Sequence, residues 1–154
     1  MKNINSQYYE LALTFIPNVG DITSKNLLSY CGSAEQVFKT PKSKLLKIPE
    51  VGEKTANSII DKTFFERVDE ELKFINKYQI KTLFFTDEEY PSRLKECIDS
   101  PILLYYKGNV HLNADKVISI VGTRNATEYG KYFLKKLCED LRDNNILIVS
   151  GLAY

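Results

Sequence analysis

The sequence of 154 residues is long enough for one ordinary domain or two small ones, and 44% hydrophobic with 27% charged residues is typical of a globular protein. Its net charge is +1, so any binding of nucleic acid must depend on local geometry rather than on bulk charge. The polar start MKNINSQYYE lacks the apolar stretch of a secretory signal, and no apolar run approaches the roughly 18 residues of a membrane span. We expect a cytoplasmic protein without membrane contact.

Three cysteines and one histidine leave few candidates for metal or nucleophilic chemistry. Cys31, Cys97 and Cys138 are an odd number of widely spaced thiols without a CxxC pair, which argues against a zinc site or a disulfide framework. His111 lies in the polar segment GNVHLNAD, which is typical of a solvated loop. The sequence therefore predicts no catalytic residue, no metal and no cofactor.

The first sixty residues contain a duplication at a spacing of 32 residues. The segment IPNVGD at 16–21 is matched by IPEVGE at 48–53, and the register continues into the helix that follows each copy. Each copy predicts a helix, a tight turn and a second helix, with the proline ending the first helix and Gly20 or Gly52 taking a positive φ in the turn. We expect an all-α N-terminal module over residues 1–78.

The first copy carries clear signals for where its helices begin and end. Apolar residues at 8–15 predict a buried helix. The next helix is expected to be capped by Asp21 or Thr23 and to end at Gly32, a residue type that is common just beyond the end of a helix.

The repeated turn resembles the helix-hairpin-helix motif of SAM-like modules, in which amide groups at a helix N-terminus bind DNA backbone phosphate without reading the base sequence. Gly20, Gly52 and Lys54 are the candidates for such weak contacts. Both copies lack the second glycine of the motif, and Asp21 and Glu53 directly follow the retained glycine, where a carboxylate repels phosphate. The alternative is that the hairpins form a packing or protein-contact module.

Near residue 78 the sequence changes from a helical pattern to strand-like apolar runs, and this change predicts a second domain over residues 79–154. Before it, the apolar stripe within residues 61–78 indicates an amphipathic helix. After it, the runs at 80–85 and 102–106 are typical of strands, with a short helix beginning near Pro91 between them.

The last forty residues predict a strand at 116–121, a helix from about Thr127 to Arg142, and a strand at 146–149. Strands that are apolar throughout, joined by one helix, indicate a right-handed parallel βαβ unit. The fold class predicted for the whole chain is α/β, with the helical module followed by the first part of a Rossmann-like parallel sheet.

Ligands of such sheets bind outside the carboxyl ends of the strands, beside the N-terminus of the following helix. Two such ends are visible here, Gly122-Thr123-Arg124 and Ser150-Gly151, and we expect them to converge on one pocket. The guanidinium of Arg124 suits phosphate, although pairing with a nearby acid is an equal alternative on spacing alone. The spacing of glycines excludes both the dinucleotide fingerprint and the P-loop.

Taken in order, these segments resemble the bacterial DNA-processing protein A family, also called Smf, over nearly the whole chain. The matching pieces are the I-P-x-V-G turn, Tyr90-Pro91, Lys107-Gly108, Val121-Gly122-Thr123-Arg124 and Ser150-Gly151-Leu152-Ala153. The V-G-T-R motif, followed 26 residues later by S-G-L-A, is the most specific of them.

The resemblance implies an extended Rossmann fold that binds single-stranded DNA, forms homodimers and helps to load the RecA recombinase on incoming strands during natural transformation, without catalysis. By position, Gly122, Thr123 and Arg124 would belong to a pocket for a DNA phosphate, with Ser150 and Gly151 as its neighbouring wall. Because the family continues past S-G-L-A, we expect an N-terminal fragment that ends inside the Rossmann domain.

Two other functions remain open from the sequence. One is a nucleotide- or phosphoribosyl-hydrolysing enzyme on a related Rossmann fold, and the other is a helical protein-interaction module without DNA binding.

Overall fold

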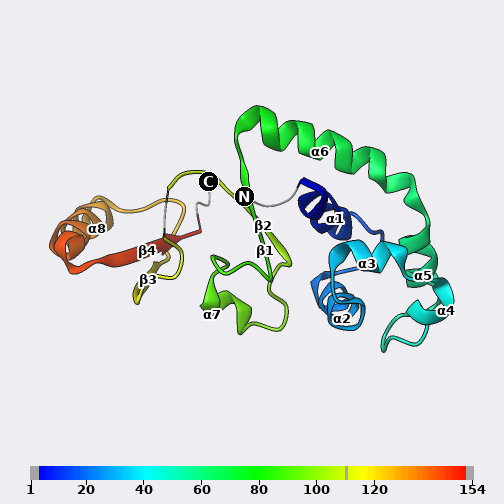
Figure 1. Ribbon diagram of the computed structural model, residues 1–154. Coiled ribbons are helices and arrows are strands. Elements are labelled where there is room, and N and C mark those ends of the chain that lie inside the picture. Colours follow the sequence, from blue (N-terminus) through cyan, green and yellow to red (C-terminus); the bar gives the residue numbers. More distant parts are fainter. Residues whose placement is uncertain (1–3, 110, 152–154) are drawn as a thin grey trace. The chain divides into compact units, whose positions relative to one another are not determined.

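The computed structural model describes residues 4–109 and 111–151 and divides into two compact units (Figure 1). We call residues 1–109 the helical unit and residues 110–154 the βαβ unit. Leu152 and Ala153, the end of the S-G-L-A motif, lie outside the described residues.

The helical unit is built around one apolar core to which every major helix contributes. Its helices are α1 (Ile4–Thr14), α2 (Asp21–Cys31), α3 (Ala34–Lys39), α4 (Lys42–Leu45), α5 (Glu53–Ile60) and, after a 3-10 turn at Lys62–Phe64, α6 (Phe65–Tyr78). The first helix contacts α2, α3 and α6, and α6 runs along the unit (Figure 1). Val68 and Ile75 are buried on α6, as the predicted amphipathic stripe requires.

The two copies of the sequence repeat adopt the same backbone. Each turn closes with an amide-to-carbonyl hydrogen bond, from Val19 to Ile16 at 3.2 Å in the first copy and from Val51 to Ile48 at 3.1 Å in the second. Both isoleucines are buried, which holds the turns against the core. The predicted duplication is therefore a structural one.

The residue that takes the left-handed conformation in each turn is not the predicted glycine. Asn18 has φ 62° and Glu50 has φ 66°, whereas Gly20 and Gly52 are extended, with φ −94° and −88°, as the N-caps of α2 and α5. The prediction of positive φ at the glycines, and of Asp21 or Thr23 as the cap, is wrong because the chain reverses two residues earlier. Gly32 does end α2 as predicted, with φ 87° and its amide bonded to the carbonyl of Leu28 at 2.8 Å.

Two antiparallel strands complete the helical unit. β1 (Lys81–Phe84) pairs with β2 (Leu103–Tyr106), and α7 (Ser92–Lys95) lies in the connection between them. The predicted boundary near residue 78 coincides with the end of α6, while contacts divide the chain after Asn109. The two divisions differ because Phe84 and Leu103 belong to the same core as the helices.

Buried polar contacts fix the connection between β1 and β2. The side chain of Tyr90 is fully buried, and its hydroxyl donates to the carbonyl oxygen of Pro101 at 2.5 Å. Burial raises the pKa of the Tyr90 phenol, because the charged form would lose its hydration. At the start of the connection, the carboxylate of Asp87 accepts from the amide of Phe84 at 2.7 Å.

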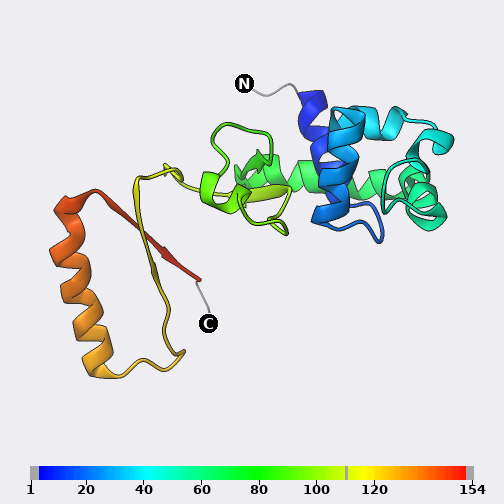
Figure 2. The same cartoon turned by 90° about the horizontal axis from the view of Figure 1, so that it is seen from below.

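The βαβ unit has the predicted order of strand, helix and strand. β3 (Lys116–Ile120) and β4 (Ile146–Ser150) pair in parallel, and α8 (Glu128–Leu141) lies alongside them (Figure 2). Thr127 caps α8 by accepting the amide of Gly130 at 3.1 Å, and a 3-10 turn at Arg142–Asn144 leads into β4. The α/β class with an N-terminal helical module is confirmed.

Candidate functional site

The carboxyl ends of β3 and β4 lie side by side and form the wall of an open pocket. The strand register pairs Ile120 with Ser150, so the segments that leave the two strands begin at the same edge. Between them lies a cavity of about 200 Å³, lined by Ile120, Val121, Gly122, Thr123, Arg124, Ser150 and Gly151. All five residues predicted as the main site line this one pocket.

The loop that follows β3 is shaped by its own hydrogen bond and leaves space for a ligand. The Thr123 hydroxyl donates to the carbonyl oxygen of Asn125 at 3.0 Å, so it holds the loop rather than pointing a free donor into the pocket. No atom lies within 4 Å of where a Cβ would stand on Gly122 or Gly151, so a ligand can approach the backbone at both. The N-terminus of α8 follows the loop directly and adds a partial positive charge.

Arg124 is the one formal charge among the residues that line this pocket. Its side chain is exposed, and within residues 4–109 and 111–151 it is part of no ion pair, so the alternative of a partner acid is not observed there. An unpaired guanidinium beside glycine backbone is suited to a phosphate oxygen. The pocket's chemistry therefore favours an anion.

The weaker candidates of the helical unit sit at the tips of the two hairpins. Gly20, Gly52 and Lys54 are all exposed. The acids beside the glycines have different partners in the two copies. The carboxylate of Asp21 accepts from the amide of Ile102 at 2.8 Å, whereas Glu53 forms an exposed ion pair with Lys42 at 2.6 Å.

The sequence did not indicate that polar side chains at the start of α2 contact the segment before β2. One turn after Asp21, the ammonium of Lys25 donates to the carbonyl oxygen of Ile98 at 2.8 Å and to the hydroxyl of Ser100 at 2.7 Å. It also lies 4.8 Å from the ring centre of Phe85. The beginning of α2 thus anchors the segment that leads into β2. The only sequence signal was an acid and a base four residues apart, which is too common to have indicated this.

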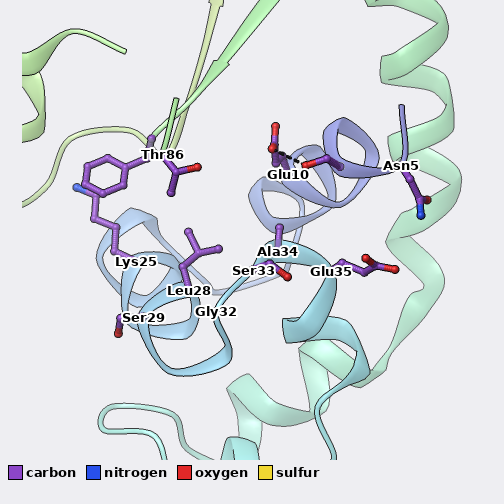
Figure 3. Close-up of a pocket in the computed structure, with 12 residues that line it drawn as sticks. Asn5, Glu10, Lys25, Leu28, Ser29, Gly32, Ser33, Ala34, Glu35 and Thr86 are labelled. Atoms are coloured by element: carbon purple, nitrogen blue, oxygen red, sulfur yellow. Dashed lines mark hydrogen bonds between the residues drawn. The ribbon is translucent and has the colours of Figure 1, made fainter. Parts of the chain in front are cut away.

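A second cavity, of about 430 Å³, lies between α1, α2 and the start of α3 (Figure 3). On its wall, Glu10 is only 5% exposed and its carboxylate accepts from the Ser6 hydroxyl at 2.9 Å. The sequence did not indicate this cavity because its lining comes from separate segments of the chain, including Ser33 and Thr86.

Comparison with known families identifies both halves of the chain. Residues 11–71 match the family model described as helix-hairpin-helix motif, and residues 81–154 match the one described as DNA recombination-mediator protein A. The chain thus combines a region that matches the helix-hairpin-helix model with a region that matches the recombination-mediator model. It belongs to the DNA-processing protein A family, DprA or Smf.

Relatives from several bacteria agree with the family models. The chain is 35% identical over 91 residues to the DNA processing protein DprA of Bacillus subtilis, which is 58% of this chain and 31% of that protein. It is 40% identical over 67 residues to DprA of Streptococcus pneumoniae, covering 44% and 23% of the two chains. It is 30% identical over 157 residues to protein Smf of Synechocystis, covering 97% and 38%. The chain therefore spans about a third of the length of these relatives.

Among the described residues, no helix combines the length and the apolar character needed to cross a membrane.

Proposed function

We propose that the chain carries the N-terminal part of a single-stranded DNA-binding protein of DNA processing, with a DNA phosphate held by Gly122, Thr123, Arg124, Ser150 and Gly151. The observation that carries this proposal is that all five residues line one pocket, with Arg124 as its formal charge. Backbone amides and a guanidinium recognise phosphate without regard to the base, as a DNA-processing protein requires.

The finer parts of the proposal are taken from the resemblance to the family and extend beyond what the names of the relatives say. The complete protein would form homodimers and help to load RecA on strands taken up during natural transformation, in the cytoplasm and without catalysing a reaction. The names of the relatives, DNA processing protein DprA and protein Smf, support the general role in DNA processing.

Fluorescence anisotropy with a labelled single-stranded oligonucleotide tests the pocket. We expect the chain to bind, binding to weaken between low and high salt, and duplex DNA to compete poorly. Arg124→Ala should weaken binding about tenfold or more, because a charged hydrogen bond to phosphate is lost.

Arg142→Ala is the matched control for this variant. Arg142 is also an exposed arginine of the βαβ unit, but it follows the other end of α8, whose 14 residues span about 21 Å. A folded chain that does not bind, or equal losses in the two variants, would contradict the proposed phosphate site.

A further inference from the structure

The side chain of Arg124, on which the proposed phosphate site depends, is not anchored among the residues that the structure describes. Its guanidinium is exposed and has neither an ion pair nor a hydrogen bond there. Such a side chain loses conformational freedom when it binds a ligand, which lowers affinity. The affinity of the pocket therefore depends on how far the backbone of Arg124 is already fixed before a ligand arrives.

The backbone is held at both ends of the loop that carries Arg124. Before the loop, Ile120 pairs with Ser150 at the end of the parallel strands. After it, Thr127 caps α8, and its hydroxyl accepts the amide of Gly130 at 3.1 Å. Residues 121–126 belong to no helix or strand, so their conformation is set within the loop.

One side-chain hydrogen bond closes this loop around Arg124. The hydroxyl of Thr123 donates to the carbonyl oxygen of Asn125 at 3.0 Å, so the bond joins the two neighbours of Arg124. Among the described residues, it is the one side-chain hydrogen bond between the end of β3 and the cap at Thr127. The turn that contains Arg124 is thus closed by a threonine hydroxyl.

A phosphate cannot use what remains of the Thr123 hydroxyl. A hydroxyl has one proton to donate, and that of Thr123 is engaged by Asn125. The hydroxyl oxygen can still accept, but the phosphodiester of a nucleic acid is ionised and has no proton to donate. Thr123 can therefore contact a phosphate directly only by releasing the turn that contains Arg124. The two roles exclude each other.

We propose that Thr123 is a positioning residue, whose bond to Asn125 fixes the backbone of Arg124 and so directs the guanidinium into the pocket that Arg124 lines. This inference rests on the phosphate site proposed above and gives Thr123 its role within that site. Fixing the backbone in advance raises affinity because less conformational freedom is lost on binding. Gly122, by contrast, serves a phosphate through the open space beside its backbone.

The test is a double-mutant cycle on the binding of the chain to a labelled single-stranded oligonucleotide. Thr123→Val keeps the branched shape of threonine without its hydroxyl, and it should weaken binding about three- to tenfold, the size expected for one hydrogen bond. Thr123→Ser keeps the hydroxyl and should restore most of that affinity. In the Arg124→Ala background, Thr123→Val should have no further effect, because no guanidinium is left to direct.

Thr14→Val is the matched control for removal of a threonine hydroxyl. Thr14 is also exposed, and its hydroxyl also donates to a backbone carbonyl oxygen, that of Leu11 at 2.8 Å, but it lies in α1 of the helical unit. Its substitution should leave binding unchanged. Circular dichroism confirms that each variant is folded.

A second measurement detects the positioning without DNA. In NMR relaxation of the free chain, the order parameter of the Arg124 amide should fall in Thr123→Val, because the turn is no longer closed. In Thr123→Ser it should stay close to the value of the parent. An unchanged order parameter in Thr123→Val would overturn the inference.

The outcomes of the cycle separate this inference from the phosphate site itself. If Arg124→Ala weakens binding but Thr123→Val does not, the positioning role is overturned while the phosphate site stands. If the two losses multiply in the double variant, Thr123 contacts the strand independently of Arg124, and the positioning role is again overturned. If the folded parent does not bind, or Arg124→Ala binds as the parent does, the phosphate site is overturned together with the role of Thr123.

Discussion

At the scale of single residues, backbone conformation rather than residue type decides which glycines the fold requires. Gly32 has φ 87°, a region that other residues occupy at a cost, whereas Gly20 is extended and accepts any side chain. No atom lies within 4 Å of the Cβ position at either glycine, so steric clashes do not complicate the comparison.

Serine substitution should therefore destabilise the protein at Gly32 but not at Gly20. Gly32→Ser should lower the free energy of unfolding by about 1 kcal/mol, because serine is strained at positive φ. Gly20→Ser should leave it unchanged or raise it by a few tenths of a kcal/mol, since serine is a good N-cap. Urea unfolding followed by circular dichroism measures both, and equal losses would contradict the assignment of Gly20 as an extended cap.

At the scale of elements, the beginning of α2 anchors the chain that leads into β2. Ile102 is fully buried, and its amide donates to the carboxylate of Asp21. Removing this acceptor leaves a buried amide without its partner, which costs more than an exposed ion pair contributes.

The repeat supplies a matched pair of variants for this contact. Asp21→Ala should lower the free energy of unfolding by about 1–3 kcal/mol, and Asp21→Asn by less, because its amide oxygen still accepts the bond. Glu53→Ala, at the equivalent position of the second copy, should change it by less than about 1 kcal/mol, because its ion pair with Lys42 is exposed. Both acids stand in the first turn of a helix, so the dipole contribution is the same. Equal effects in the urea midpoint would show that the Asp21 contact adds nothing.

At the scale of the whole molecule, the buried apolar residues among those that the structure describes lie in the helical unit. The core cluster runs from Leu11 in α1 to Leu103 in β2, while α8 has no buried residue. Burial of apolar surface is the main stabilising term in folding, so the two units should differ in independent stability.

We expect residues 1–109 to fold alone and to unfold in urea with the same midpoint as the helical signal of the whole chain. All residues of the core cluster belong to this unit, and its two strands pair with each other. Loss of a cooperative transition in the shortened chain, followed by circular dichroism, would show that the βαβ unit contributes to that core.

The sequence predicts features formed by residues close together in the chain better than contacts between residues far apart in it. The βαβ unit and its pocket were predicted because each strand end and the helix that follows are local in sequence, and parallel pairing then brings Gly122 and Ser150 to one edge. The contact between Asp21 and Ile102 joins residues 81 positions apart, and no local pattern encodes it. The positive φ was assigned to Gly20 from residue type alone, but an asparagine tolerates that conformation well enough to take it instead.

The acidic residues at the two hairpin tips have different partners, and this difference determines which substitutions each copy of the repeat tolerates. Both copies have the same backbone conformation. Position 21, however, accepts a hydrogen bond from the buried Ile102, while position 53 forms an exposed ion pair. Substitutions at position 21 are therefore restricted to side chains that present an acceptor to Ile102, whereas position 53 is free to change. The second copy is the one in which new surface chemistry can arise without loss of the fold.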